Sequence, residues 1–287
     1  MKLVRYGAPG QERPGLIDAQ GRLCDLSAHV GDIDADALVR TGRARLAAVD
    51  PATLPEVAGA PRYGAPVAHV GKMICVGLNY TDHAAETGAK PPEQPILFMK
   101  ATSAIMGPDD DVVIPKDSVK TDWEVELGVV IGDTARHVSV ADALKHVAGY
   151  VLVNDLSERE FQLEHGGQWV KGKSCDTFGP IGPWLLTADE VADPQDLAMW
   201  LAVNGHRYQD GNTRNMIFGV AELVSYISRY MTLQPGDIIS TGTPAGVGLG
   251  MKPPVYLRPG DVIELGIDGL GRQRQQVRAY PGDAGRR

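Results

Sequence analysis

Residues 121–131 read TDWEVELGVVI, and this stretch decides how the rest of the chain is interpreted. Side chains alternate between the two faces of a strand, so a strand over 123–131 places Glu124 and Glu126 together on one face. Residues 129–131 are apolar on both faces, as in a buried strand. Two like charges on such a strand repel each other and lose hydration unless a cation compensates them. The pattern predicts a cation site; an exposed strand with a solvated acidic face is the alternative.

A third carboxylate follows another apolar run. Residues 149–154 read GYVLVN, and Asp155 comes directly after them. Three carboxylates without a Cys or His partner form an all-oxygen set, which favours Mg²⁺ or Mn²⁺. We therefore predict that Glu124, Glu126 and Asp155 hold a divalent metal.

The remaining pattern is rich in short strands and poor in helices. Further strands are expected at 2–6, 14–18, 22–26, 73–77, 96–100, 148–154, 199–204, 237–241, 261–266 and 273–279. Helices are expected at about 34–48, 81–88, 139–147, 157–165 and 219–231. Because strands and helices do not alternate regularly, a β/α barrel or doubly wound sheet is disfavoured, and the pattern predicts a β-rich α+β fold.

A proline-rich segment divides the chain. Residues 50–66 contain four prolines and two glycines, which is typical of a linker. We expect a small N-terminal α/β module with its linker over 1–66 and a catalytic domain over 67–287.

Composition excludes several classes of function. The net charge is −8, and the absence of a Lys/Arg cluster argues against nucleic-acid binding. No apolar run approaches the roughly 20 residues that span a bilayer. Cys24, Cys75 and Cys175 are odd in number and far apart, so no disulfide framework is expected. These features favour a cytoplasmic protein with no nucleic-acid or membrane partner.

Two further motifs carry side chains suited to catalysis. In GLNYTDHAAE (77–86), Glu86 lies three positions after His83, so on a helix the carboxylate can orient the imidazole as a general base. In KGKSCDTFGP (171–180), Lys173 in a glycine-containing turn could neutralise a substrate carboxylate or enolate. The alternatives are an ordinary surface pair for the first motif and a solvated lysine for the second.

The glycine-rich stretch STGTPAGVGLG (240–250) is not a dinucleotide loop, because prolines rather than a helix follow it. Its backbone N–H groups and hydroxyls can still bind a carboxylate.

Read together, these segments resemble the fumarylacetoacetate hydrolase superfamily. The matching pieces occur in one order from about residue 70 to the C-terminus: GLNYTDHAAE, ILFMKATSAI, TDWEVELGVVIG, AGYVLVNDLSERE, KGKSCDTFGPIGPWL, VNGHRYQDGNTRNMIF and LQPGDIISTGTPAGVG. The resemblance implies a mixed β-sandwich roll with a small N-terminal domain, a Mg²⁺ or Mn²⁺ site, and a homodimer.

The resemblance also implies roles for single residues. The metal ligands fall on Glu124, Glu126 and Asp155. The water-activating lid pair falls on His83 and Glu86, and the active-site lysine on Lys173. Substrate-binding positions fall on Arg159, Gln162 and Thr243. The sequence after Arg159 departs from the family pattern, because Glu160 replaces the commoner aspartate.

The opening MKLVRYGAPGQERPGLID and residues 159–184 are similar to one branch of the superfamily. Members of that branch hydrolyse 2,4-dioxo-3-deoxy sugar acids such as 2,4-didehydro-3-deoxy-L-rhamnonate, and many are named ureidoglycolate lyase. We expect hydrolysis of the C3–C4 bond of a 2,4-dioxo acid to pyruvate and a second acid. The alternatives are oxaloacetate decarboxylation or 2-hydroxy-dienoate isomerisation at the same site, a ureidoglycolate lyase, and a non-catalytic sensor of 2-oxo acids.

Overall fold

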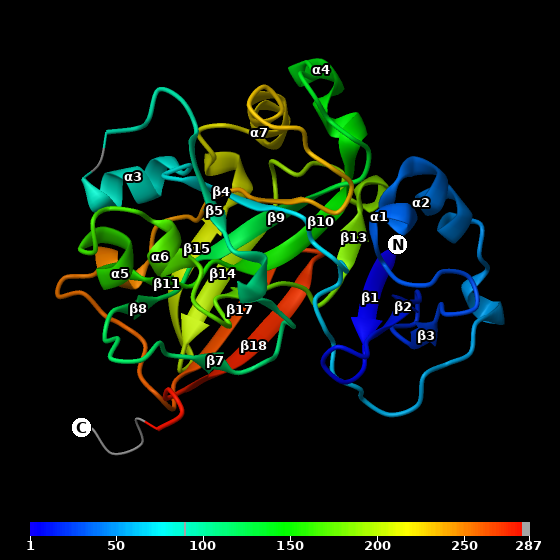
Figure 1. Ribbon diagram of the computed structural model, residues 1–287, viewed down its shortest axis with the longest axis horizontal. Helices are drawn as coiled ribbons and strands as arrows, with labels where there is room; N and C mark the ends of the chain where they lie inside the picture. The colour runs from blue at the N-terminus through cyan, green and yellow to red at the C-terminus, as the bar shows by residue number, and fades with distance from the viewer. Residues whose placement is uncertain (89, 283–287) are drawn as a thin grey trace.

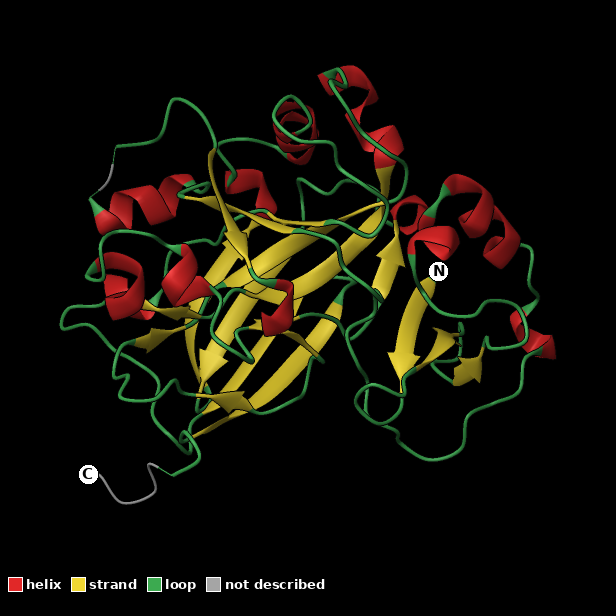
Figure 2. Ribbon diagram, viewed as in Figure 1, coloured by secondary structure: helices red, strands yellow, loops and turns green. Residues whose placement is uncertain are grey.

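The computed structural model describes residues 1–88 and 90–282, and it has the expected β-rich α+β architecture (Figures 1 and 2). Nine strands of the described chain form the larger sheet. Across the sheet they are β3 (Leu23–Asp25), β2 (Arg13–Ile17), β1 (Lys2–Tyr6), β13 (Leu185–Thr187), β10 (Val147–Asn154), β9 (Val125–Ile131), β16 (Ile238–Ser240), β4 (Met73–Gly77) and β5 (Ile96–Lys100). The N-terminal strands lie at one end of the molecule and join the rest where β1 pairs with β13.

A second sheet of five strands packs against the first. Its strands are, in order, β15 (His206–Asn212), β14 (Ala198–Val203), β17 (Val262–Ile267), β18 (Gly271–Arg278) and β7 (Val112–Val113). Two small pairs complete the strands, β11 (Ser157–Glu158) with β8 (Thr121–Asp122) and β12 (Gly179–Pro180) with β6 (Ile105–Met106).

The strands β9 and β10 are buried on both faces, as the apolar pattern predicts. One face of β9 contributes Leu127 to the core between the sheets, together with Leu201 of β14 and Leu265 of β17. The opposite face contributes Val130, which packs with residues of the N-terminal helices such as Leu38. Side chains at the ends of these two strands are therefore anchored in a well-packed core.

The domain boundary predicted at residue 66 stays a prediction.

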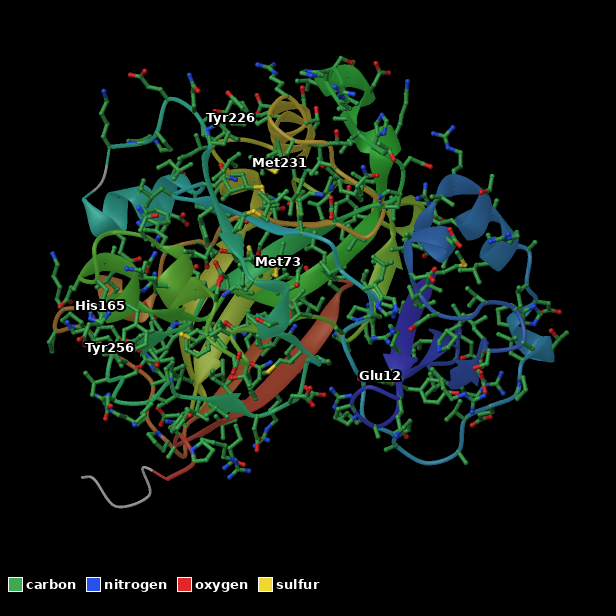
Figure 3. The ribbon with its side chains drawn as sticks, in the orientation of Figure 1. Glu12, Met73, His165, Tyr226, Met231 and Tyr256 are labelled. Carbon is green, nitrogen blue, oxygen red and sulfur yellow. The ribbon has the colours of Figure 1, made fainter. Side chains whose placement is uncertain are left out.

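The helices are short and lie around the sheets (Figure 2). They are α1 (Ala35–Leu38), α2 (Arg40–Ala47), α3 (Thr81–Thr87), α4 (Val140–Ala143), α5 (Arg159–Leu163), α6 (Val170–Lys173) and α7 (Val220–Ile227), with 3₁₀ turns η1 (Pro51–Thr53), η2 (Thr102–Ala104), η3 (Leu144–His146), η4 (Ala188–Glu190), η5 (Thr213–Asn215) and η6 (Gly248–Gly250). Figure 3 places Met73 of β4 in the interior, with Tyr226 of α7 toward one edge. No helix in the described residues combines the length and the apolar character needed to cross a membrane.

Several predicted elements are wrong in detail. The helix expected at 34–48 is divided into α1 and α2, because the extended backbone of Val39 (φ −62°, ψ 157°) ends the first and precedes the second. The strand expected at 123–131 is interrupted at Trp123 and Glu124, because the backbone N–H groups of both residues bond to side-chain oxygens rather than to a neighbouring strand. The helix expected at 157–165 begins only at Arg159, after residues 157 and 158 pair with β8. Lys173 ends the short helix α6 instead of lying in a turn.

Candidate active site

The three predicted metal-binding carboxylates meet where β9 and β10 lie side by side. Glu124 directly precedes β9, Glu126 is the second residue of β9, and Asp155 directly follows β10. The antiparallel register places Val153 opposite Glu126, and the Asp155 N–H donates to the Glu124 carbonyl at 2.9 Å. One oxygen from each carboxylate lies within 4.8 Å of the others, and all three residues are buried. The structure therefore brings together residues that are about 30 positions apart.

Positive side chains surround Glu124 and Asp155. Lys173 Nζ lies 2.7 Å from Glu124 Oε2 and 2.8 Å from Asp155 Oδ2, and Arg159 donates to Glu124 Oε1 at 2.7 Å. Burial raises the pKa of Glu124, but the charges of Lys173 and Arg159 outweigh burial and hold this pKa well below its ordinary value. Burial lowers the pKa of Lys173, but Asp155 and Glu124 outweigh it and raise this pKa above its ordinary value. Glu124 and Lys173 therefore stay charged near neutral pH.

The remaining oxygens of the cluster fit a hard divalent cation. Glu126 Oε2 accepts from the Ser240 hydroxyl at 2.6 Å and from the Gly242 N–H at 2.9 Å. Burial, together with the charges of Asp155 and Glu124, raises the pKa of Glu126 well above its ordinary value. Asp155 Oδ1 is buried and is not hydrogen-bonded among the described residues, although the Lys100 ammonium lies 2.7 Å from it as an ion pair. A divalent cation would relieve the repulsion between Glu126 and the carboxylates of Asp155 and Glu124, and an all-oxygen set suits a hard cation better than a softer metal.

Two buried residues of this site were not identified from the sequence. Lys100 Nζ lies 2.7 Å from Asp155 Oδ1 and donates its hydrogen bonds to the carbonyls of Leu156 and Lys173. Asp122 accepts from Arg159 Nε at 2.8 Å and from two backbone N–H groups of the glycine-rich loop. A signal existed for Lys100, because a charged residue at the end of the apolar run ILFMK needs a buried partner.

We expect Lys173→Met to lower the stability of the metal-free protein. Removing the ammonium leaves two buried carboxylates without their shared partner, so the free energy of unfolding should fall by roughly 3–5 kcal/mol. Adding Mn²⁺ should recover more stability in this variant than in the wild type, since the metal replaces the lost charge. Thermal unfolding with and without Mn²⁺ measures both effects. Lys171→Met, which changes an exposed lysine on the same helix, is the control; equal stability of the two variants would contradict the prediction.

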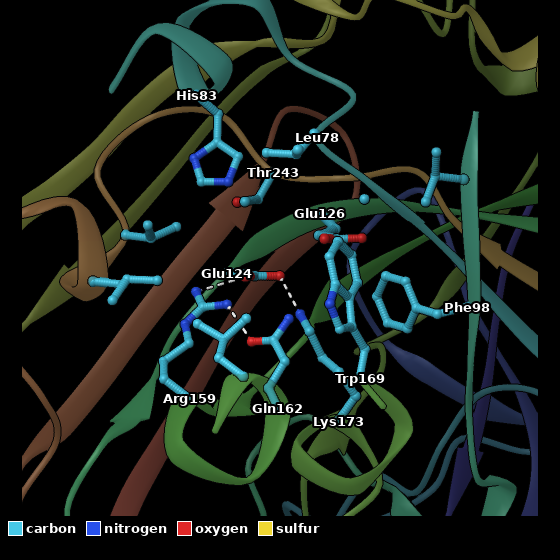
Figure 4. Close-up of a pocket in the computed structure, with 15 residues that line it drawn as sticks. Leu78, His83, Phe98, Glu124, Glu126, Arg159, Gln162, Trp169, Lys173 and Thr243 are labelled. Carbon is cyan, nitrogen blue, oxygen red and sulfur yellow. Dashed lines mark hydrogen bonds and ion pairs between the residues drawn. The ribbon is translucent and has the colours of Figure 1, made fainter. Parts of the chain in front are cut away.

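Arg159 and Gln162 lie one turn apart on α5 and face the cluster (Figure 4). Arg159 Nη1 donates to the Gln162 side-chain carbonyl at 3.0 Å, while its other nitrogens serve Asp122 and Glu124. Because Arg159 occupies that carbonyl oxygen, the NH₂ group is what Gln162 can offer a ligand. The arrangement is compatible with the predicted substrate-binding role of Gln162, which stays a prediction.

The pair His83 and Glu86 lies on α3, with His83 Nδ1 3.4 Å from Glu86 Oε2. Glu86 also accepts the N–H of Gly246, at 3.0 Å and 3.1 Å to its two oxygens. The start of α3 is held by the buried Asn79, whose side chain bonds to the backbone of Phe218 and of Thr241. The imidazole therefore has a carboxylate partner that is itself anchored to the glycine-rich loop.

Thr243 lines the same site, but its hydroxyl already has partners. It donates to the Val125 carbonyl at 2.9 Å and accepts from Gln209 Nε2 at 2.7 Å. The predicted carboxylate-binding role of this loop therefore depends on its backbone N–H groups. The sequence could not show that the Thr243 hydroxyl is occupied, because its partner Gln209 lies 34 residues away in the chain.

One cavity of about 130 Å³ joins these groups. Its wall includes Glu124, Glu126 and Lys173 together with His83 (Figure 4). Much of the remaining wall is apolar, and the Lys173 ammonium lies 5.1 Å from the centre of the Phe98 ring. A small acid could thus contact the carboxylate cluster and the imidazole at once.

Comparisons with known proteins agree on one family. Residues 72–278 match the family described as fumarylacetoacetate (FAA) hydrolase, C-terminal. A Burkholderia multivorans protein named "Putative hydrolase" is 64% identical over 280 residues, which are 97% of this chain and 99% of that protein.

Solved structures are similar over nearly the whole chain. Fumarylacetoacetate hydrolase from Exiguobacterium antarcticum is 40% identical with a TM-score of 0.88, covering 98% of this chain and 100% of that one. Maleylpyruvate hydrolase from Sphingobium sp. SYK-6 is 32% identical with a TM-score of 0.81 and the same coverage. A 2-hydroxyhepta-2,4-diene-1,7-dioate isomerase from Mycobacterium marinum is 32% identical with a TM-score of 0.74, covering 98% and 99%.

Proposed function

The chain belongs to the fumarylacetoacetate hydrolase family, and we propose that it hydrolyses the C3–C4 bond of a 2,4-dioxo acid to pyruvate and a second carboxylic acid. The observation that carries the proposal is the cavity whose wall holds Glu124 and Glu126 of the carboxylate cluster together with His83 and Lys173. We propose Mg²⁺ or Mn²⁺ as the cofactor and Glu124, Glu126 and Asp155 as its ligands.

The cofactor, when bound, supplies Lewis-acid polarisation of the substrate's oxygens. His83 takes a proton from a water molecule whose oxygen adds to the C4 carbonyl, and Glu86 stabilises the imidazolium that results. The C3–C4 bond then breaks, and its electron pair passes through C3 to the C2 oxygen.

Lys173 offsets the negative charge that develops at the C2 oxygen. Two of its three N–H bonds serve Glu124 and Asp155, which leaves one for the substrate. A proton returned to C3 completes pyruvate, and the C4 carbon leaves as the second carboxylic acid. Water is consumed and no redox partner is needed.

The direct test is a metal-dependent assay on short acylpyruvates. Protein stripped of metal is incubated with and without Mg²⁺ or Mn²⁺, while the enol absorbance of the substrate and the pyruvate released are followed together. We expect metal-dependent loss of absorbance with one pyruvate per substrate. Absorbance loss without pyruvate would refute the hydrolase and favour an isomerase.

An isomerase or a decarboxylase is the nearest alternative. A similar structure is named as a 2-hydroxyhepta-2,4-diene-1,7-dioate isomerase, so the fold accommodates that reaction in a relative. Neither tautomerisation nor decarboxylation of oxaloacetate requires attack by water. The anchored His83–Glu86 pair therefore favours hydrolysis.

Within the hydrolases, we propose the branch that acts on 2,4-didehydro-3-deoxy-L-rhamnonate and related acids, on the similarity of the N-terminal segment and residues 159–184. Turnover of that acid with release of pyruvate would support the assignment, whereas release of urea from ureidoglycolate would favour the lyase. Tight pyruvate or oxalate binding without any turnover would favour a sensor. The homodimer implied by family resemblance stays a prediction that light scattering can test.

A further inference from the structure

The wall of the cavity is divided between charged and apolar side chains. Beyond the carboxylate cluster and its partners, the wall consists mainly of Leu78, Phe98, Leu163, Trp169, Val247 and Leu249. Figure 4 shows Phe98 and Trp169 beside the cluster, with Leu78 near His83. A substrate whose C1 carboxylate and C2 oxygen lie at the cluster must place the rest of its chain against this apolar surface.

The two cationic side chains that line the cavity, Arg159 and Lys173, already pair with carboxylates of the protein. Arg159 donates to Asp122, Glu124 and Gln162, and it is buried. Lys173 bonds to Glu124 and Asp155, and its remaining N–H serves the C2 oxygen in the proposed reaction. Among the described residues of the wall, no other lysine or arginine is present. A second carboxylate at the far end of a substrate would therefore lose its hydration without gaining an ion pair, which is strongly unfavourable.

Some similar structures are named for substrates that carry a second carboxylate. Fumarylacetoacetate, maleylpyruvate and 2-hydroxyhepta-2,4-diene-1,7-dioate, which appear in those names, are all dicarboxylic acids. The fold therefore occurs in relatives named for substrates with a distal carboxylate. The apolar wall of this chain, where Arg159 and Lys173 already pair with carboxylates, favours a substrate without a distal charge.

We propose that this chain selects monocarboxylic 2,4-dioxo acids whose C4 substituent is short, uncharged and ends in a hydrocarbon group such as methyl. The inference rests on the proposed hydrolase function and narrows its substrate class. Alkyl acylpyruvates belong to this class. So does 2,4-didehydro-3-deoxy-L-rhamnonate, whose chain ends in a methyl group.

A matched pair of substrates tests the inference. 2,4-Dioxoheptanoate and 2,4-dioxoheptanedioate have the same seven-carbon chain and differ only in the terminal group, a methyl or a carboxylate. We expect kcat/KM to favour the monoacid by at least about tenfold, because the diacid must bury an unpaired charge. An equal or higher kcat/KM for the diacid overturns the inference while the hydrolase stands. If neither acid is cleaved in the presence of Mn²⁺, the hydrolase proposal fails, and this inference with it.

A cation placed on the apolar wall should weaken the preference for the monoacid over the diacid. Leu163 is 45% exposed at the cavity, so Leu163→Arg can add a guanidinium without disturbing the core. We expect the ratio of diacid to monoacid kcat/KM to rise by roughly tenfold, the value of one added charge interaction. Leu144→Arg is the control, since Leu144 is 44% exposed and is not part of the cavity wall.

Affinity gives a readout that does not depend on turnover. Calorimetric titration of both acids into Mn²⁺-loaded His83→Ala protein should show tighter binding of the monoacid. In the double variant that also carries Leu163→Arg, the affinities for the monoacid and the diacid should differ less. Equal affinity for both acids, or the same change with Leu144→Arg, overturns the assignment of the apolar wall as the selecting surface.

Discussion

Replacing Glu126 by glutamine is expected to abolish Mn²⁺ binding while the protein stays folded. Glutamine has the same shape, and its carbonyl can still accept from the Ser240 hydroxyl and the Gly242 N–H. The amide lacks the charge that a divalent cation requires, however. Loss of an outer partner of a metal ligand typically lowers metal affinity by about 10–100-fold, so loss of a ligand itself should exceed about 100-fold. Hydrolysis should fall with it.

Calorimetry with Mn²⁺ and circular dichroism measure the two halves of this prediction. The matched control is Asp237→Asn, which neutralises another buried carboxylate just before β16 in the same sheet. Asp237 pairs with Lys72 and accepts N–H bonds from Lys72 and Gln234, so this variant should lose stability but keep its Mn²⁺ affinity. Unchanged Mn²⁺ affinity in Glu126→Gln would remove Glu126 from the ligand set.

The sequence predicts the carboxylate cluster because burial and charge leave a strong local signal. Two strands that are apolar on both faces end at, or carry, Glu124, Glu126 and Asp155, and few physical reasons exist for charges in such places. The fold class follows from the same strands and from the lack of regular alternation with helices. The convergence of the three side chains depends on β9 and β10 being neighbours, which the pattern alone does not contain.

Other parts of the site depend on contacts between distant segments, and these leave little local signal. The interruption of the strand at Trp123 and Glu124 depends in part on Asn154, which accepts the Glu124 N–H. Lys100, at the end of β5, lies beside Asp155, which directly follows β10. The hydroxyl of Thr243 is occupied by Gln209 from another sheet. In each case the deciding partner is at least 30 residues away, so a local pattern such as ILFMK can indicate that a charge is buried but not which residue it contacts.

The two halves of the site are coupled through the glycine-rich loop. Gly242 donates to Glu126 in the carboxylate cluster, and Gly246 donates to Glu86 beside the imidazole. Gly246 has a φ of +107°, and a Cβ there would lie 2.0 Å from the Tyr208 carbonyl oxygen, so no other residue fits without displacing the loop. One short segment thus sets the position of the proposed general base relative to the proposed metal ligands.

His83→Ala is expected to reduce hydrolysis of a 2,4-dioxo acid by roughly 10²–10⁴-fold, the usual range for loss of a general base. Mn²⁺ affinity should not change, since His83 is not among the clustered carboxylate ligands. Decarboxylation of oxaloacetate, if the protein catalyses it, should be much less affected, because that reaction needs no activated water. The large loss of rate should therefore appear in hydrolysis and not in decarboxylation.

The matched control for this prediction is His165→Ala, which removes an exposed imidazole that stacks on Phe161. It should leave both reactions unchanged. Glu86→Gln should give a smaller loss in kcat than His83→Ala, because the amide still holds the Gly246 N–H but supports a protonated imidazole less well. Hydrolysis at the wild-type rate in His83→Ala would show that another group activates the water. An equal loss in both reactions would instead mean that His83 orients the substrate, since only a general base acts on the water that hydrolysis consumes.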